Sequence, residues 1–239
     1  MAASEAVAEV RQLFQLTEFE EVLGLQKAVW GFDDVELLPG RFLIVVNSVG
    51  GQVFGAYMSG RMVGFCDALP GIKPDGRPYL HSDMLGILPE YRNIGIGRRL
   101  KLLQREEALS RGIELIEWTF DPLELKNAYF NIERLGAIVR RYHPNQYGIT
   151  GSPLHGSLPT DRLYAEWWLN RPAPAPVEPA ARIAYPNDIA RLRTADPALA
   201  RSIQQEKAAE FRDAFQRGLA VTGFERGVTE SAYLLEPWQ

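Results

Sequence analysis

A glycine-rich turn near the middle of the chain constrains the fold more than any other feature. It lies in the stretch LPEYRNIGIGRRL, residues 88–100, between a strand-like apolar run and a helix-like run. Glycines at 95 and 97 leave backbone amides unshielded where the helix begins, and a helix N-terminus attracts anions. The turn therefore predicts a strand–turn–helix unit that binds an anionic group, although a solvated basic face is the simpler alternative.

Composition limits the classes of protein to consider. The 239 residues are 46% hydrophobic and 23% charged, as in globular proteins with a buried core. A net charge of −4 argues against nucleic-acid binding, and Cys66, the only cysteine, excludes an intrachain disulfide. The start lacks a signal-peptide pattern, and the run FLIVV is too short to cross a membrane. We expect a cytoplasmic protein without membrane contact, and the dispersed histidines predict no metal site.

Periodicity and turn residues predict an alternation of helices and strands. Near the end, the Pro/Ala-rich stretch 171–179 predicts a linker, and 180–239 predict an α+β appendage docked on the preceding domain. The expected elements are a helix at 17–30 capped by Thr17, a short helix near 39–49, a hairpin turning at Ser59-Gly60, a loop at 70–78, a strand at 79–88, a helix from the glycine turn to Arg111, a strand at 113–119, a helix at 121–136 capped by Asp121, strands at 137–142, 162–169 and near 182–186, a helix from Asp196-Pro197 to Gly218, and a hairpin turning at Arg226-Gly227.

Two common phosphate loops do not fit the turn. A Walker loop needs Lys-Ser or Lys-Thr after its glycines, and here Arg98-Arg99 follow. A dinucleotide-binding turn needs a third glycine, which Leu100 replaces.

The pattern that fits is R-x-x-G-x-G from Arg92 to Gly97, followed by a buried strand and a helix ending in RLGA. This arrangement resembles the phosphate loop of the GNAT superfamily of N-acetyltransferases. The resemblance implies an α/β (α+β) fold in which helices flank a mixed central sheet, with residues 1–170 as the acyl-CoA-binding domain. It implies acetyl-coenzyme A as co-substrate and transfer of its acetyl group to an amine.

The resemblance also implies a set of cofactor contacts. The backbone of Leu85, Gly86 and Ile87 would pair with the pantetheine arm, and the N–H of Leu85 or Ile87 would face the thioester oxygen. Asn127, together with Asn131, is a candidate to hydrogen-bond the arm, or else a surface residue. The turn that would cradle the pyrophosphate comprises Arg92, Asn93, Ile94, Gly95, Ile96, Gly97 and Arg98.

Proton transfer needs a base for the ammonium and an acid for the leaving thiolate. Asp83 shares a predicted strand face with Leu85 and is the candidate base, and His81 lies on the same face; structural hydrogen bonding is the alternative for both. Many family members carry a Tyr four residues before the helix-ending glycine, where this chain has Ile132. Tyr129, one turn earlier, is the candidate acid, with Tyr142 and Tyr147 as alternatives.

The predicted function is direct acyl transfer from coenzyme A to an amine, without a covalent enzyme intermediate. The alternative is a non-catalytic coenzyme A-binding module with a regulatory or scaffold role, which the missing Tyr favours. The acceptor, a small molecule or a peptide amine, cannot be identified because loops without a general code decide acceptor specificity. The acyl chain length cannot be identified either, and a homodimer is left open.

Overall fold

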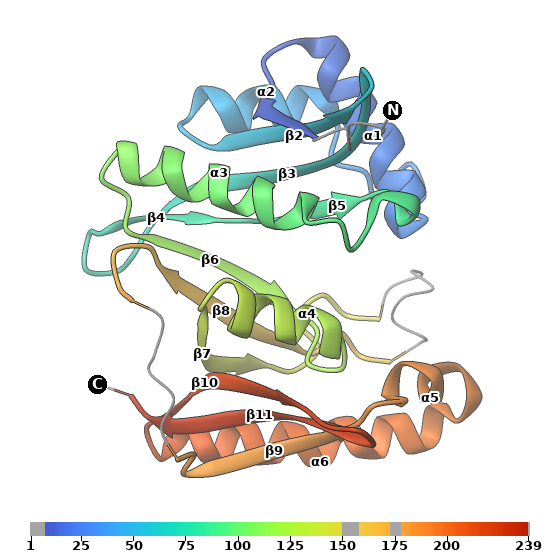
Figure 1. Cartoon of the computed structure of the whole chain (residues 1–239), viewed down its shortest axis with the longest axis vertical. Coiled ribbons are helices and arrows are strands. Elements are labelled where there is room, and N and C mark those ends of the chain that lie inside the picture. Colours follow the sequence, from blue (N-terminus) through green and yellow to red (C-terminus); the bar gives the residue numbers. More distant parts are fainter. Residues whose placement is uncertain (1–7, 150–157, 173–177, 239) are drawn as a thin grey trace, which may run out of the picture. The chain divides into compact units, whose positions relative to one another are not determined.

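The computed structural model describes residues 8–149, 158–172 and 178–238, and its contacts divide the chain into two compact units, 1–116 and 117–239 (Figure 1). The predicted linker at 171–179 falls within the second unit, and its residues 173–177 lie outside the described part of the chain. The predicted domain limits at 170 and 180 stay a prediction.

The first unit contains a sheet built around one long hairpin. Ser59 and Gly60, with φ of 50° and 79°, form the predicted hairpin turn. β1 pairs with β2, β2 pairs with β3, and both β4 and β5 pair with β3, all antiparallel. The elements are β1 (Glu9–Gln12), α1 (Leu16–Trp30), α2 (Gly40–Ser48), β2 (Gln52–Met58), β3 (Arg61–Ile72), β4 (Pro78–His81), β5 (Leu85–Ile87), η1 (Pro89–Tyr91) and α3 (Ile96–Ser110).

Helices cover this sheet on both faces. In Figure 1, α3 lies in front of β2 and β3, while α1 and α2 lie behind them. Phe19 of α1, Leu43 of α2 and Leu100 of α3 are fully buried with Phe54 and Phe65 of the sheet. Burying such side chains is the main favourable contribution to folding, so the apolar stripes predicted for these helices define the core of the unit.

Two local predictions in the first unit are corrected. α1 begins after Gln15, not Thr17, because Glu18 Oε2 accepts hydrogen bonds from the N–H groups of Phe14 and Gln15 at 2.8 and 2.9 Å. The predicted loop at 70–78 is shorter than expected, because β3 runs on to Ile72 and β4 begins at Pro78, which leaves 73–77 as the turn between them.

The strand predicted at 79–88 is interrupted by a β-bulge. Leu69 of β3 pairs with His81 of β4, and Cys66 of β3 pairs with Leu85 of β5. Between these pairs, two residues of β3 face three residues, 82–84, on the other side. One additional residue breaks the alternation of faces, so the shared face predicted for His81, Asp83 and Leu85 does not carry through.

The second unit has a six-stranded sheet in the order β6-β8-β7-β10-β11-β9. In Figure 1, α6 lies behind the strands β9, β10 and β11. The elements are β6 (Leu115–Phe120), α4 (Leu125–Tyr129), a π-helical turn η2 (Phe130–Arg134), β7 (Ile138–His143), β8 (Arg162–Trp168), β9 (Ala181–Pro186), α5 (Ile189–Ala195), α6 (Pro197–Gln216), β10 (Leu219–Arg226) and β11 (Glu230–Pro237).

The helix predicted at 121–136 differs from the observed one in two ways. It begins at Leu125, because the Asp121 carboxylate accepts the Leu123 N–H at 2.8 Å in a local turn before the helix. Its second half is π-helical from Phe130 to Arg134, and Gly136, with φ of 76°, follows its end, as predicted. α6 begins after Asp196, whose carboxylate accepts the Leu199 N–H at 3.0 Å, again as predicted.

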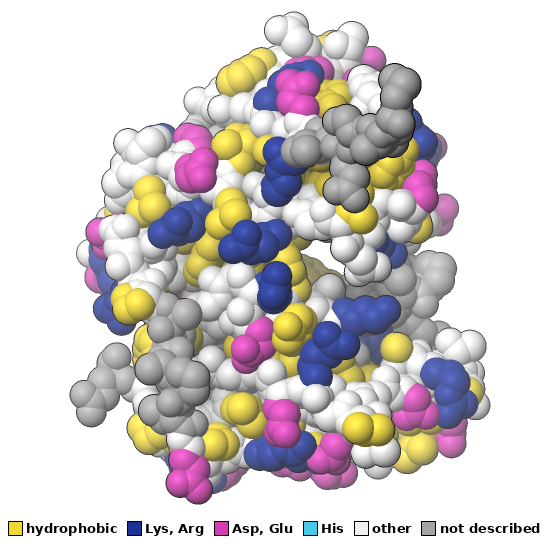
Figure 2. All heavy atoms as spheres, in the orientation of Figure 1, with side chains coloured by type: hydrophobic (Ala, Val, Ile, Leu, Met, Phe, Trp, Pro, Cys, Tyr) yellow, Lys and Arg dark blue, Asp and Glu magenta, His cyan; other side chains and the backbone are white. Residues whose placement is uncertain are grey.

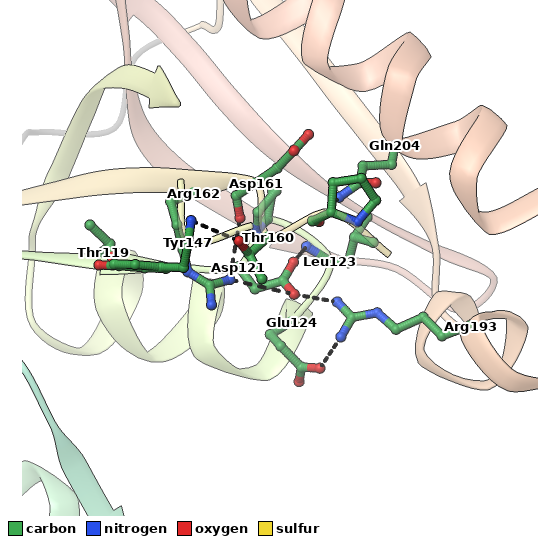
Figure 3. Close-up of polar contacts among 12 residues, drawn as sticks. Thr119, Asp121, Leu123, Glu124, Tyr147, Thr160, Asp161, Arg162, Arg193 and Gln204 are labelled. Carbon is green, nitrogen blue, oxygen red and sulfur yellow. Dashed lines mark hydrogen bonds and ion pairs between the residues drawn. The ribbon is translucent and has the colours of Figure 1, made fainter. Parts of the chain in front are cut away.

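Residues 180–238 pack on β6–β8 within the second unit. Val221 of β10 pairs with Val139 of β7, and the ring of Phe211 in α6 stacks on Tyr142 of β7 at 5.6 Å. Arg193 of α5 reaches back to Asp121 and Glu124, as Figure 3 shows. These contacts supply a buried surface for the aromatic side chains near the C-terminus.

Candidate active site

The glycine turn presents free backbone amides at the start of α3. Gly95, with φ of 88°, is the N-cap, and Asn93 also has a positive φ of 65°. The first intrahelical hydrogen bond joins the Arg99 N–H to the Gly95 carbonyl at 3.1 Å. The amides of Ile96, Gly97 and Arg98 make no hydrogen bond within the described residues. Three N–H groups at a helix N-terminus form an anion-binding site.

The first turn of α3 carries no acidic residue. Arg98 is exposed, and Arg99 and Arg105 are partly exposed along the same helix. Figure 2 shows Lys and Arg side chains over the surface of α3. The basic side chains and the helix dipole therefore both favour a negatively charged ligand.

Arg92 links the turn to the preceding strand. Its Nε donates a hydrogen bond to the Ile87 carbonyl at 3.0 Å. Its two Nη nitrogens have no hydrogen bond to any residue the structure describes. The guanidinium is thereby oriented by the strand end, while its outer nitrogens stay available to an anion.

The register of β5 decides which of its polar groups face outward. The Met84 carbonyl accepts from the Asp67 N–H, and the Leu88 N–H donates to the Val63 carbonyl. Leu85 and Ile87 are therefore the non-hydrogen-bonded positions of the β3–β5 ladder, and their N–H and C=O groups point away from β3. β5 pairs only with β3 among the described strands, so its far side can accept one more extended chain.

Gly86 has the opposite orientation. It is the hydrogen-bonded partner of Phe65, so its N–H and C=O face β3 and not the predicted pantetheine side. A Cβ at this position would lie 2.7 Å from a ring atom of Trp30. Gly86 is therefore required for packing against α1, a role the sequence pattern did not indicate.

Asp83 lies at the bulge with an exposed side chain. Its N–H donates to the Asp67 carbonyl at 3.2 Å. Desolvation by the surrounding protein raises the pKa of Asp83, and the nearby charge of His81 lowers it. The net upward direction makes Asp83 a stronger base than an ordinary aspartate.

Of the other predicted residues, Asn127 is exposed and Asn131 is buried at the π-helical turn. Tyr129 is partly buried, and the guanidinium of Arg226 in β10 lies 4.9 Å from its ring centre. Ile132 is buried at the position of the family's Tyr.

The two alternative tyrosines differ in their surroundings. Tyr142 is buried and its hydroxyl donates to the Asp161 carboxylate, so desolvation and that hydrogen bond raise the pKa of Tyr142. Tyr147 is 51% exposed, with its hydroxyl 3.1 Å from Thr119 Oγ1. A buried phenol with a raised pKa is a poor proton donor, so Tyr142 is unsuited to the role of acid.

Sequence reasoning missed the buried polar cluster behind the bulge. Lys101 belongs to this cluster, and only 2% of it is exposed. Its Nζ lies 2.8 Å from Ser82 Oγ and 3.1 Å from Gln104 Oε1. Desolvation lowers the pKa of Lys101 from 10.5 to about 8. The sequence signal for its burial is its place in the helical period, on the buried face of α3 directly after Leu100.

We expect the cost of burying Lys101 to depend on pH. The folded state holds the Lys101 proton less tightly than the unfolded state, so the charged lysine lowers stability at pH 7. This cost disappears as the pH rises from about 8 to 10.5. Relative to Lys101→Met, the wild-type free energy of unfolding should rise by about 2–3 kcal/mol between pH 7 and 10. Urea unfolding of both proteins measures this difference, and parallel pH curves would contradict the assignment.

A family comparison identifies the fold. The family model described as the acetyltransferase (GNAT) family matches residues 11–136, more than half of the chain. The chain belongs to the GNAT acetyltransferase family. Among proteins with curated functions, none matches the chain.

Solved structures agree with this assignment at the level of the fold. The ribosomal-protein-S18-alanine N-acetyltransferase from Escherichia coli is 15% identical, with a TM-score of 0.54 over 72% of this chain and 99% of that one. Arabidopsis thaliana Naa50, in complex with the bisubstrate analogue CoA-Ac-MVNAL, is 15% identical, with a TM-score of 0.52 over 66% and 97%. An N-acetyltransferase from Staphylococcus aureus Mu50 is 14% identical, with a TM-score of 0.54 over 70% and 100%.

This GNAT protein is therefore an acyltransferase that moves the acetyl group of acetyl-coenzyme A to an amine. The neighbours are matched over nearly their whole length, and about a third of this chain lies outside the shared fold. No helix in the described ranges is long and apolar enough to cross a membrane. No group of three or more potential metal-binding side chains occurs in those ranges.

Proposed function

We propose that the α3 turn and the free edge of β5 together form the acetyl-coenzyme A site. The proposal rests on a row of backbone N–H groups without main-chain partners among the described residues, which begins on β5 and continues at the start of α3. Leu85 and Ile87 offer N–H groups along β5, and the amides of 96–98 follow at the helix N-terminus. An extended arm ending in a pyrophosphate matches a strand edge that leads to an anion-binding turn.

In this proposal the turn residues 92–98 bind the pyrophosphate through backbone amides and the Nη groups of Arg92. The pantetheine arm pairs with Leu85 and Ile87, and the Leu85 N–H stabilises the negative oxygen that forms when the amine attacks the thioester. Leu85 is favoured over Ile87 for this role because it directly follows the bulge that carries Asp83. Asp83 removes the proton from the attacking amine, directly or through one water molecule.

The leaving thiolate needs a proton donor. We propose Tyr129, which occupies α4 before the π-helical turn and lies under the guanidinium of Arg226. The cation–π contact fixes the orientation of the ring. Asn127, exposed on the same helix, is proposed to hydrogen-bond the cofactor arm.

The acceptor is proposed to be a small-molecule or peptide amine, acetylated in the cytoplasm. The structural neighbours include a ribosomal-protein-alanine N-acetyltransferase and a protein bound to a CoA-peptide analogue. A homodimer stays an open prediction.

The test of the cofactor site is Gly97→Asp. A Cβ at Gly97 meets only Leu85 Cδ2 at 3.7 Å and Ile87 Cγ1 at 4.0 Å, so the substitution fits sterically. An acidic residue in the first helical turn is favourable to the helix, but it places negative charge where the pyrophosphate binds. Acetyl-coenzyme A affinity should fall at least ~10-fold, about 1.4 kcal/mol, with the melting temperature unchanged or raised.

Gly97→Ala is the matched control, because it adds bulk without charge and should lose less affinity. Arg92→Ala should also lose less than Gly97→Asp, since the amides remain in place. Isothermal titration with coenzyme A and with dephospho-coenzyme A measures all three variants. Unchanged affinity in folded Gly97→Asp would show that this turn does not bind the cofactor.

A further inference from the structure

One buried residue, Asp67 of β3, makes every hydrogen bond that joins β3 to the bulge at 82–84. Its N–H donates to the Met84 carbonyl at 3.2 Å, and its carbonyl accepts from the Asp83 N–H at 3.2 Å. The Met84 N–H donates to Asp67 Oδ1 at 3.1 Å. The additional residue leaves the Met84 N–H without a main-chain acceptor on β3, and the Asp67 side chain replaces that acceptor.

A second layer of contacts joins this bulge to α3. Ser82 Oγ lies 3.2 Å from the Asp67 carbonyl and 2.8 Å from Lys101 Nζ. Gln104 Nε2 donates to the same carbonyl at 3.3 Å. All four side chains are almost completely buried, with exposures of 0% for Asp67 and Gln104, 2% for Lys101 and 3% for Ser82. The helix that begins at the anion-binding turn therefore also holds the bulge.

The bulge determines which backbone groups of β5 face the open edge. Without the additional residue, the register would shift by one position. The N–H groups of Leu85 and Ile87 would then face β3, and that of Gly86 would face outward. An outward Gly86 N–H would not compensate, because the Trp30 and Phe65 rings confine this residue.

We propose that Asp67, supported by Ser82, Lys101 and Gln104, is a positioning residue that fixes the bulge and thereby aims the Leu85 N–H at the thioester oxygen. The inference rests on the proposed function, since it assigns a structural cause to the oxyanion donor of that same site. Asp67 touches neither cofactor nor acceptor in this assignment and acts through the backbone of 82–85.

The chemistry of Asp67 and its neighbours indicates which substitution at Asp67 should preserve the bulge. Burial, with Asp83 nearby, raises the pKa of Asp67 well above its ordinary value and favours the neutral acid. Asp67 Oδ2 has no hydrogen-bond partner in the described part of the chain, and Oδ1 is the atom that accepts from Met84. Asparagine keeps the Oδ1 acceptor and the shape of a neutral acid, whereas alanine removes the acceptor and leaves the Met84 N–H unpaired.

The experiment compares Asp67→Asn, Asp67→Ala and Ser82→Ala with wild type and with Glu106→Gln, an exposed position on α3. For each protein, kcat is measured with an amine that wild type acetylates. Titration calorimetry measures the affinity for coenzyme A, and hydrogen exchange measures the exchange rate of the Met84 amide. Asp67→Ala should lower kcat about 10²-fold, the scale of a misplaced catalytic group, with coenzyme A affinity within about 3-fold. The Met84 amide should exchange faster.

Asp67→Asn should retain kcat within about 5-fold of wild type, because it restores the acceptor. Ser82→Ala breaks only the link to α3 and should lower kcat by about 10-fold or less. A kcat within about 3-fold of wild type in folded Asp67→Ala, or an equal loss in Asp67→Asn and Asp67→Ala, would overturn the inference. If Asp67→Ala does not fold, a kcat loss of more than about 5-fold in Asp67→Asn, or unchanged exchange of the Met84 amide in Ser82→Ala, overturns the inference.

The two proposals fail in different ways. If wild type binds coenzyme A but acetylates no amine in a panel, the proposed catalytic roles fail. The Met84 amide then decides the positioning role, because exchange that is unchanged in Asp67→Ala, or in Ser82→Ala where Asp67→Ala is unfolded, would overturn it. If wild type turns over normally and the Asp67 and Ser82 variants show no change, the proposed function stands and the positioning role of Asp67 is wrong.

Discussion

Asp83→Asn is expected to lower turnover by about 10²-fold or more, the scale on which a general base contributes. The substitution keeps the size of the side chain and removes its ability to accept the proton from the attacking amine. Acetyl-coenzyme A affinity should change little, since Asp83 lies at the bulge and not in the turn proposed to bind the pyrophosphate. Steady-state kinetics with thiol release as the signal measures the effect, and titration with coenzyme A measures the affinity.

The pH profile separates a base from a structural carboxylate. The base must be deprotonated, so wild-type kcat/KM should rise as the pH increases through the raised pKa of Asp83. In Asp83→Asn this rise should be lost. Asp213→Asn, an exposed aspartate on α6, is the matched control and should leave both turnover and profile unchanged. Turnover of Asp83→Asn within a factor of about two of wild type would remove Asp83 from the mechanism.

Arg193→Met is expected to destabilise the protein by about 3–5 kcal/mol, the cost of removing one partner from a buried ion pair. The Arg193 side chain is 5% exposed, and its Nη nitrogens lie 2.8 Å from Asp121 and 3.1 Å from Glu124. Methionine leaves the Asp121 charge, only 12% exposed, with less compensation. The melting temperature should fall by about 6–20 °C, at about 2–4 °C per kcal/mol for a chain of this size.

The control for this prediction lies two residues away on α5. Arg191 pairs with Asp188 at 2.6 Å, but its side chain is 67% exposed. Arg191→Met should therefore cost no more than about 1 kcal/mol. A melting temperature that falls equally in the two variants would show that the ion pairs of Arg193 with Asp121 and Glu124, drawn in Figure 3, are not what attaches α5 to its neighbours. Adding Asp121→Asn to Arg193→Met should recover part of the loss, because it removes the uncompensated charge.

The sequence alone determined most of the order of elements, without β1 and α5, and the position of the glycine turn. These depend on local physics: glycines that adopt a positive φ, a helix N-terminus with free amides, and apolar periods of 3.6 and 2. The hairpin at Ser59-Gly60 and the α6 cap at Asp196 were predicted for the same reason. The family resemblance depended on that same turn, and the match of the GNAT family model to residues 11–136 confirms the family.

Only the tertiary structure decided what the bulge, the cluster behind it and the α5 ion pairs do. A bulge is a mismatch between two strands, so no pattern within residues 79–88 records it. The burial of Lys101 depends on Ser82 and Gln104, and Arg193 meets Asp121 from 72 residues away along the chain. Such pairings are decided by which surfaces the folded elements bury against each other, because the energy of a buried charge depends on its neighbours in space.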